Sequence, residues 1–516
     1  LGAMMIFIVF EAGRRVLGYS LPVFCGFFLF FAYFGRSMPG PFRHFGLSVP
    51  RIIEELYLTT DGLFGLVTGV SATYIYLFIL FGAFLGSTGT AKFFNDLAMA
   101  LTGHLKGGPA KIAVLSSALM GTISGSTSAN VATTGTFTIP LMKKIGYQPF
   151  FAGAVEAAAS TGGQIMPPVL GAAAFIIADT LGISYLKVLV ASVVPAILYF
   201  FGIWCSLSLE ASKLGLKGLE KSILPKAKDV ILRDGYKAIP LAGIIYFLVQ
   251  GYNPLYAGCW GIILAVILSF VRKEDRMEPK KFIKTLEDGS KSALSVAVAC
   301  FIVGVVIGMM GATGIALRVG DAILTMTQGS LALTLIATML LAVALGMGMP
   351  TTASYVMASA VGAPALILLG CKPLDVHFFV FYFAALSSIT PPVCVGAYTA
   401  AGIAGADPNR TAIASMRLGL AGFIIPFVFI YSPELMLTNV TNWVSFGVAV
   451  VTACVGVFSL AVATEGYALG PISLPLRFLA FAAAILLIVP GIVTDAAGIV
   501  LLALVVVLSR RAGTGR

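Results

Sequence analysis

Charged residues are scarce in this chain of 516 residues, where they make up 11% of the total. Soluble domains carry about 25% charged residues, so the composition excludes an ordinary soluble protein. The mean hydropathy is +0.99, and apolar runs of membrane-spanning length recur about ten to twelve times. The main runs are 64–86, 150–178, 188–209, 255–271, 293–311, 331–347, 376–403, 418–432, 444–464 and 475–508. They are too long and too uniformly apolar for barrel strands, so the sequence predicts an all-α polytopic membrane protein.

Cysteine pairs and catalytic motifs are missing as well. The seven cysteines are scattered through apolar segments without a CxxC pair, which argues against a zinc site or a disulfide framework. The chain contains no HExxH, no GxSxG, no Walker A loop and no dinucleotide-binding GxGxxG on a strand. We therefore expect neither an enzyme nor a resident cofactor. Without an ATP-binding motif, transport would be driven by an ion gradient or by a partner chain.

The positive charge is concentrated in two segments. Residues 213–237 and 272–291 hold seven Lys or Arg each, 14 of the 33 in the chain. No soluble module exists on which these patches could bind nucleic acid, and clusters of Lys and Arg mark cytoplasmic loops of membrane proteins. Two spans within 238–271, turning at Gly251-Tyr-Asn-Pro254, would return both loops to the same side. The pattern predicts a multi-pass protein with the lipid bilayer as its surroundings.

An internal repeat is visible in the small residues. The stretch GSTSANVATTGTFTIPLMKKIGYQP (125–149) matches MPTTASYVMASAVGAPALILLGCKP (349–373) at a shift of 224 residues. The same shift brings Pro167-Pro168 onto Pro391-Pro392. In each copy a Gly/Ser/Thr cluster interrupts an apolar segment, and a later span ends in a polar loop with a double proline.

Broken helices at matching positions of two halves indicate the midplane site of a transporter. Glycine and proline clusters break helices, and in lipid a broken helix persists only where protein or water meets its freed backbone groups. The pattern alone leaves open whether the two repeats are parallel or inverted.

The breaks offer neutral oxygens, which suit a monovalent cation, while carboxylates that a divalent ion would require are absent from them. Sodium is the ion that we expect, bound among Ser126, Asn130, Thr351 and Thr352. The alternative is that the small residues only allow close helix packing, which would not explain Asn130 and Gln164. The candidate oxygens belong to Ser124, Ser126, Thr127, Ser128 and Asn130, to Thr351, Thr352 and Ser354, and to Ser160, Thr161, Gln164, Ser387, Ser388 and Thr390.

One carboxylate lies inside an apolar segment, Glu156 in FFAGAVEAAAS. An ionisable residue at membrane depth is a functional candidate by default. Glu156 could carry protons or could anchor its helix against a neighbour, and the sequence leaves both readings open.

The passages GTISGSTSANVATTGTFTIPLMKKIGY, AVEAAASTGGQIMPP, GMGMPTTASYV and HFFVFYFAALSSITPPV resemble the large membrane subunit of tripartite ATP-independent periplasmic (TRAP) transporters. The resemblance covers about residues 10–435. The upstream EAGRRVLGYSLP resembles fused permeases, in which the small and large membrane subunits form one chain, and which most often work with a TAXI-type binding protein.

This resemblance implies a sodium-driven importer in the inner membrane that receives organic acids from a periplasmic binding protein and works as an elevator. By position, it places the hairpin tips at Ser124–Asn130 and Gly348–Ser354, and completes the cation and substrate cavity with Gly163, Gln164, Pro167, Thr390, Pro391 and Pro392. A carboxylate is the expected cargo. The alternatives are a stand-alone symporter or antiporter, driven by protons through Glu156, and a channel or passive scaffold subunit.

We expect five segments along the chain. The chain begins LGAMMIFIVF, which reads as the middle of a span and suggests that part of a small-subunit-like region is missing upstream. The segments are 1–60, a remnant of the small-subunit-like and connecting helices; 61–212, the first repeat; 213–292, the basic loops with two spans; 293–435, the second repeat; and 436–516, additional C-terminal spans.

Overall fold

The computed structural model describes residues 1–438, 440, 442–488 and 491–514. The remaining residues, Asn439, Thr441, Val489, Pro490, Gly515 and Arg516, belong to the predicted segment 436–516 and lie outside the described residues. Within the described ranges the chain is helical, with one isolated bridge between Tyr467 and Pro471 and no named strand. The prediction of an all-α protein is confirmed. The chain divides into two compact units, each of which is discontinuous in sequence.

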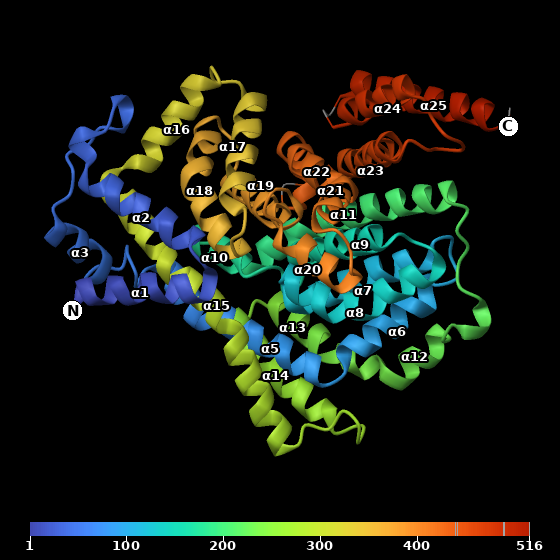
Figure 1. Ribbon diagram of the computed structural model, residues 1–516, viewed down its shortest axis with the longest axis horizontal. Helices are drawn as coiled ribbons and strands as arrows, with labels where there is room; N and C mark the ends of the chain where they lie inside the picture. Colours follow the sequence, from blue (N-terminus) through green and yellow to red (C-terminus); the bar gives the residue numbers. More distant parts are fainter. Residues whose placement is uncertain (439, 441, 489–490, 515–516) are drawn as a thin grey trace. The chain divides into compact units, whose positions relative to one another are not determined.

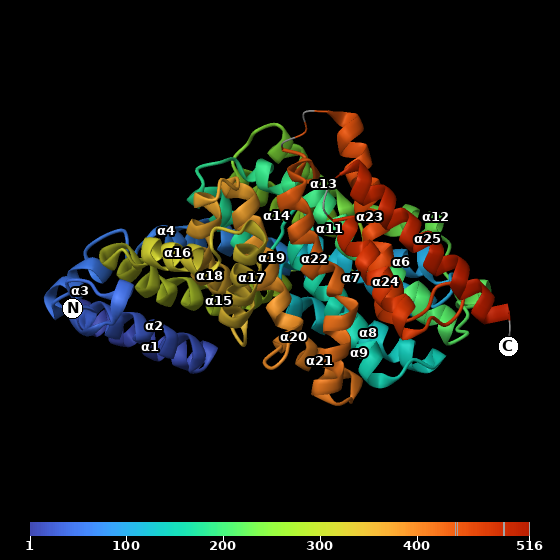
Figure 2. The same cartoon turned by 90° about the horizontal axis from the view of Figure 1, so that it is seen from above.

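Unit 1 comprises Leu1–Thr88, Gly171–Val188 and Pro240–Ser387. Its longest helix, α15, has 35 residues and packs against α1, α2, α5 and α18. In Figures 1 and 2, α17 and α18 lie side by side as a hairpin. The helices of unit 1 are α1 (Gly2–Leu17), α2 (Ser20–Tyr33), α3 (Val49–Tyr57), α4 (Leu66–Val70), α5 (Tyr76–Ser87), α10 (Ala173–Thr180), α13 (Ile239–Val249), α14 (Pro254–Ser269), α15 (Pro279–Thr313), α16 (Ile315–Met326), α17 (Leu331–Gly346), α18 (Thr351–Leu368) and α19 (Pro373–Leu386).

Unit 2 comprises Gly89–Leu170, Leu189–Ile239 and Ser388–Arg516. At its centre α9 packs against α7, α8, α20 and α21. The helices of unit 2 are α6 (Thr90–Thr102), α7 (Gly108–Ser124), α8 (Thr127–Ile145), α9 (Pro149–Gly162), most of α11 (Tyr185–Lys213), α12 (Ala227–Asp234), α20 (Val395–Ala404), α21 (Pro408–Leu418), α22 (Leu420–Tyr431), α23 (Trp443–Glu465), α24 (Leu474–Leu486) and α25 (Ile492–Thr514).

Among the described residues, seven helices are long and apolar enough to cross a membrane. Six shorter apolar helices have 10–17 residues. Two runs that were expected as single spans, 150–178 and 376–403, are each divided into two helices. The first run contains α9 and α10, and the second contains α19 and α20. Proline has no backbone N–H, so the double prolines between these helices prevent one continuous helix.

The helices repeat with the spacing seen in the sequence. α8 begins at Thr127 and α18 begins at Thr351, 224 residues later. α9 and α19 span 149–162 and 373–386, and each continues into a short 3-10 turn, Gly163–Ile165 and Ser387–Ile389. Both proline pairs contain a cis peptide bond. The two halves therefore share one backbone plan.

Each half contributes to both compact units. The chain passes from unit 2 to unit 1 after Leu170 and from unit 1 to unit 2 after Ser387. As a result, α10 from the first half packs against α18 and α19 in unit 1, while α20 from the second half packs against α8 and α9 in unit 2. The five predicted segments are divisions along the chain and stay predictions; the compact units cut across them.

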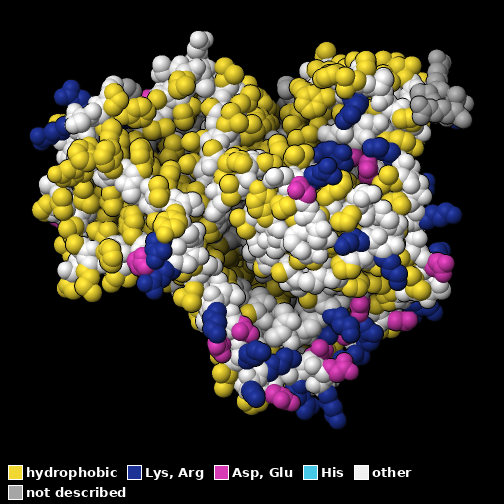
Figure 3. Space-filling view, in the orientation of Figure 1, with side chains coloured by type: hydrophobic (Ala, Val, Ile, Leu, Met, Phe, Trp, Pro, Cys, Tyr) yellow, Lys and Arg dark blue, Asp and Glu magenta, His cyan; other side chains and the backbone are white. Residues whose placement is uncertain are grey.

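On the face of unit 1 that Figure 3 shows, charged and apolar side chains lie apart. In Figure 3, hydrophobic side chains cover much of the visible surface at α15 to α18, and Lys and Arg gather near the loop after α14. That loop, 270–278, opens the second basic segment. The helices α13 and α14 occupy the stretch in which two spans were expected, with a turn at 250–253 between them.

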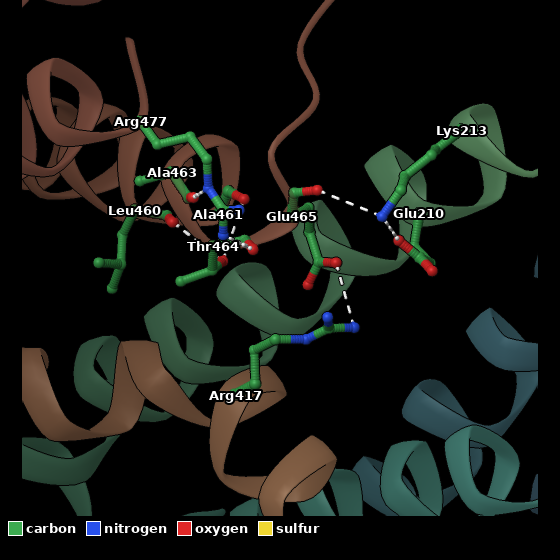
Figure 4. Close-up of polar contacts among 9 residues, drawn as sticks. All are labelled: Glu210, Lys213, Arg417, Leu460, Ala461, Ala463, Thr464, Glu465 and Arg477. Atoms are coloured by element: carbon green, nitrogen blue, oxygen red, sulfur yellow. Dashed lines mark hydrogen bonds and ion pairs between the residues drawn. The ribbon is translucent and has the colours of Figure 1, made fainter. Parts of the chain in front are cut away.

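Within unit 2, the C-terminal helices are held by an apolar cluster and by buried charge. Cys205 and Leu209 of α11 pack with apolar residues of α23, α24 and α25. The Glu465 side chain at the end of α23 is 0% exposed, and its Oε2 lies 3.4 Å from Nη2 of Arg417 on α21 (Figure 4). Lys213 donates to Oε2 of Glu210 at 3.1 Å and to the Glu465 carbonyl at 3.4 Å. A buried carboxylate requires a partner, and Arg417 provides it.

Candidate functional site

The first break lies in unit 2, where α7 ends and α8 begins. α7 stops at Ser124, and Gly125 adopts a left-handed conformation with φ of 54°, which glycine tolerates without strain. Ser126 is extended, and its Oγ accepts from the Ala129 amide at 3.5 Å, a weak cap for α8. The α7 C-terminus and the α8 N-terminus thus meet across two residues. A cation suits the first end, and an anion suits the second.

Three hydroxyls and an amide lie together directly behind this break. Thr127 Oγ1 lies 3.4 Å from Ser388 Oγ, and Thr161 Oγ1 lies 3.2 Å from the same atom. Nε2 of Gln164 donates to Thr127 Oγ1. The other end of this amide, Gln164 Oε1, is buried without a hydrogen-bond partner. A buried acceptor without a partner is costly and is available to a ligand.

Asn130 ties α8 to α7 in the same unit. Its side chain is 0% exposed, and Nδ2 donates to the Ser117 carbonyl at 2.8 Å. The backbones come very close at this point, because a Cβ added to Gly121 would lie 2.2 Å from the Gly163 Cα. The two glycines let the polar loop after α9 approach the hairpin.

Glu156 lies deeper in unit 2 and is also 0% exposed. Its Oε1 accepts from Ser117 at 2.8 Å and from Ser160 at 3.0 Å, and it also contacts the Thr134 hydroxyl. Its Oε2 contacts the Thr138 hydroxyl. The sequence identified Glu156 and Ser160 but not the bond between them, and it gave no indication of Ser117, Thr134 or Thr138. Thr134 and Thr138 are four residues apart on α8, as are Glu156 and Ser160 on α9. This spacing becomes a useful signal only when it is known that the two helices face each other.

The second break lies in unit 1, between α17 and α18. Gly348 has a φ of 73°, and Pro350 precedes the first residue of α18, Thr351. Ser354 Oγ is buried without a hydrogen-bond partner, and Ser387 Oγ donates to the Gly346 carbonyl at 3.1 Å. The break therefore has a free acceptor, as the first one does.

A buried Tyr–His pair supports the second hairpin. Tyr355 Oη lies 2.7 Å from His377 Nδ1, which joins α18 to α19. Sequence reasoning missed this pair because the two residues are 22 positions apart, on helices whose facing sides were unknown. His377 alone gave no indication of its partner.

The predicted site residues are divided between the two units. Unit 2 brings together Thr127, Gln164 and Ser388, with Asn130 and Gly163 close behind them. Ser126 is exposed, Ser124 and Ser128 are half-buried, and none of these three is bonded to the Thr127 group. Unit 2 also holds Pro167, Thr390 and Pro391, and unit 1 holds Gly348, Thr351, Thr352 and Ser354. The predicted sodium ligands thus come from both units, so each half is considered by itself.

The chain is similar to known permeases over most of its length. Residues 4–444 match the family model for the DctM component of the tripartite ATP-independent periplasmic transporters. The isethionate TRAP transporter permease protein DctMQ of Oleidesulfovibrio alaskensis is 24% identical over 368 residues, which are 71% of this chain and 56% of the relative. The chain thus matches just over half of that relative's length.

A shorter stretch is more similar to another relative. The C4-dicarboxylate TRAP transporter large permease protein DctM of Pseudomonas aeruginosa is 36% identical over 124 residues, 24% of this chain and 29% of the relative. Among solved structures, the YdaH transporter of Alcanivorax borkumensis matches with a TM-score of 0.48 and 16% identity, over 75% of this chain and 89% of that one.

The family match covers both breaks, both double prolines and the helices that position them. It confirms the prediction of a transporter rather than an enzyme, in a multi-pass membrane protein. The chain belongs to the DctM family, the large membrane component of tripartite ATP-independent periplasmic transporters.

Proposed function

We propose that this protein is a sodium-coupled secondary importer of organic acids that receives its substrate from a periplasmic binding protein, in the bacterial inner membrane. The observation that carries the proposal is the first break in unit 2. There, the carbonyl end of α7, the Thr127 hydroxyl and the unpartnered Gln164 Oε1 offer neutral oxygens without a competing carboxylate. Such oxygens at a helix break suit sodium.

The cation half-site in unit 2 consists of Ser126 and Asn130, close to the Thr127 group. Asn130 Oδ1 is a buried amide oxygen on the first turn of α8. The other two predicted ligands, Thr351 and Thr352, stand at the start of α18 in unit 1, and their part in sodium binding is a proposal of the same kind.

The substrate that we propose is a carboxylate. One similar protein is named for C4-dicarboxylates and another for isethionate, which is a sulfonate. Both kinds of compound carry an anionic group. The N-termini of α8 and α18 carry partial positive charge, which stabilises an anion placed before them. The identity of the acid is left to the binding protein, which we propose is of the TAXI type.

We propose an elevator as the mechanism, with the hairpins α7–α8 and α17–α18 as the parts that hold ion and substrate. The support is the repeated plan of two broken hairpins, each followed by a double proline. Paired discontinuous helices at corresponding positions are the arrangement by which secondary transporters bind substrate near the midplane.

The test is uptake into liposomes that contain the chain, with its binding protein loaded with a labelled carboxylate outside. We expect accumulation only under an inward sodium gradient, and none when potassium replaces sodium. Equal uptake without a sodium gradient would contradict sodium coupling. Uptake that persists without a binding protein would instead indicate a stand-alone symporter or antiporter.

A matched pair of variants locates the ion. Asn130→Ala removes the buried amide oxygen of α8, whereas Ser128→Ala removes a half-buried hydroxyl of the same turn that bonds to none of the Thr127 group. We expect the first variant to need more sodium for half-maximal uptake and the second to behave as the parent chain. If both behaved alike, sodium would not be bound at Asn130.

A further inference from the structure

The hydroxyl network around Glu156 brings each threonine close to more than one acceptor. The Thr134 hydroxyl has one proton, yet it lies near three oxygens that only accept: the Asn130 carbonyl at 2.8 Å, Asn130 Oδ1 at 3.3 Å and Glu156 Oε1. The Thr138 hydroxyl likewise lies near both the Thr134 carbonyl, at 3.1 Å, and Glu156 Oε2. A hydroxyl donates one hydrogen bond only.

One proton on the Glu156 carboxyl fits the Thr138 side of this network. If Glu156 Oε2 carries it, Oε2 donates to Thr138 Oγ1, and Thr138 is free to donate to the Thr134 carbonyl. Glu156 Oε1 is then a carbonyl oxygen that accepts from Ser117 at 2.8 Å and from Ser160 at 3.0 Å. If the carboxyl were ionised instead, the four surrounding hydroxyls could all donate to it, but its negative charge would be buried among neutral groups alone.

No cation neutralises Glu156 among the described residues. The helices packed against α9 carry few charged or titratable groups, and none of them contacts the Glu156 carboxyl. Lys111 lies over the Trp204 ring at 4.9 Å, Lys143 donates to the Ala404 carbonyl at 2.8 Å, and Arg417 pairs with Glu465. The charged or titratable groups on these helices are Lys111 on α7, Lys143 and Lys144 on α8, Tyr398 on α20, Arg410 and Arg417 on α21, and Tyr185, Lys187, Tyr199, Cys205, Glu210 and Lys213 on α11.

The spacing of the oxygens fits a proton and not a sodium ion. Hard cations hold oxygens about 2.3–2.6 Å from the ion, which separates neighbouring oxygens of the shell by about 3.3 Å or more. Ser117 Oγ lies 2.8 Å from Glu156 Oε1 and 3.1 Å from Thr134 Oγ1, so these oxygens enclose no space for such an ion. They are at hydrogen-bond distance, which a single proton bridges.

We propose that Glu156 is a proton-binding site: its carboxyl holds one proton on Oε2, donated to Thr138, inside the hydroxyl network of α7, α8 and α9. The bound proton removes a negative charge that would otherwise be buried without a counter-ion. The site reaches the hairpin tip through Thr134, which contacts Asn130. The proposal is separate from sodium coupling, and either can fail without the other.

The test is infrared spectroscopy of the purified full chain at neutral pH, in water and in heavy water. The spectrum of the Glu156→Gln variant is subtracted from that of the parent chain. We expect this difference spectrum to show the carbonyl band of a protonated carboxyl group, and we expect the band to shift in heavy water. Glu54→Gln, which changes an exposed carboxylate paired with Arg51, is the control and should leave this band in place. A difference spectrum with only the two carboxylate bands would overturn the proposal.

A second variant keeps the test decisive if Glu156→Gln fails to fold. Thr138→Val removes the oxygen that accepts the proton but keeps the shape of the side chain. We expect the same carbonyl band at a higher frequency, because its hydrogen bond is lost. An unchanged band would assign it to another carboxyl and contradict the proposal. Loss of the band when sodium replaces potassium would show that the network binds sodium instead.

Discussion

The two hairpins have one backbone plan and different interiors. In unit 2, Glu156 of α9 lies among hydroxyls of α7 and α8. The residues 224 positions later are apolar or small, with Val380 in place of Glu156. The partners Ser117, Thr134, Thr138 and Ser160 correspond to Leu341, Ala358, Gly362 and Ala384.

The reverse holds for the polar pair of unit 1. Tyr355 and His377 bond to each other across α18 and α19, whereas the corresponding positions in the first half are Val131 and Gly153. Glycines, prolines and helix limits thus repeat, but the buried polar groups do not. The repeated glycines and prolines therefore account for the two helix breaks. The buried polar side chains near each break differ between the two hairpins.

The largest effect is expected where backbones touch. In Gly121→Ala the added Cβ would lie 2.2 Å from the Gly163 Cα, and backbone cannot move aside cheaply. We expect the free energy of unfolding to fall by at least about 3 kcal/mol. The control is Gly346→Ala in unit 1, whose Cβ would meet the hydroxyls of Ser387 and Ser354, for which we expect a loss of about 1 to 2 kcal/mol.

Denaturant unfolding of both purified variants, followed by circular dichroism, measures this difference. The prediction would be contradicted if Gly346→Ala lowered the free energy of unfolding more than Gly121→Ala does. In that case the tight contact in unit 2 would be able to relax, and the first hairpin would be held less closely than its geometry indicates.

The buried ion pair of unit 2 should give the next largest effect. Arg417→Met leaves Glu465 buried without its partner, and we expect a loss of about 3 kcal/mol, near the low end for buried pairs because Arg417 is 38% exposed. The position 224 residues earlier is Val193, so the first half has no such pair. Replacing both residues, Arg417→Met with Glu465→Leu, should recover most of the stability in a thermal unfolding assay.

The stability of the double variant shows whether the loss in Arg417→Met comes from the unpaired Glu465 carboxylate. If it were as unstable as Arg417→Met alone, the loss would come from packing of the arginine stem, for example against the Phe151 ring, and not from the unpaired carboxylate.

A smaller effect is expected at the proposed ion ligands. Asn130→Ala and Thr351→Ala should each weaken sodium activation of uptake by about 1 to 2 kcal/mol, or roughly 5- to 30-fold in sodium concentration. The control is Ser359→Ala, further along α18, which removes a hydroxyl bonded to the Val356 carbonyl of its own helix, and we expect little change. Normal transport by both Asn130→Ala and Thr351→Ala at limiting sodium would contradict the ion assignment.

The smallest effect concerns the polar pair of unit 1. Tyr355→Phe removes the 2.7 Å bond to His377 and should lower stability by about 1 kcal/mol, without altering sodium activation. Sodium activation curves and thermal unfolding of the same preparation check both statements. A change in the sodium dependence would give the Tyr355–His377 pair a part in ion binding, which its contacts do not indicate.

The breaks could be predicted from the sequence because their causes are local. Glycine at 125 and 348 allows left-handed backbone, and the double prolines end helices wherever they stand. The start of α8 at Thr127 and of α18 at Thr351 follows from these residues alone.

The sequence did not predict the features that depend on which helices face each other. The exchange of α10 and α20 between the units and the hydroxyl partners of Glu156 are long-range contacts. Nothing local distinguishes Thr138, which bonds to Glu156, from Thr136, which is exposed on the same helix. Likewise, nothing in the local sequence distinguishes Ser126, which is exposed, from Asn130, which is buried.

Sodium binding at the first hairpin is the central claim, and hydrogen–deuterium exchange tests it most directly. We predict that sodium, and not potassium at equal concentration, slows backbone exchange across 124–134 in the purified chain without any binding protein or substrate. Protection should be lost in Asn130→Ala and kept in Ser128→Ala. Equal exchange of this segment in sodium and in potassium would contradict the account.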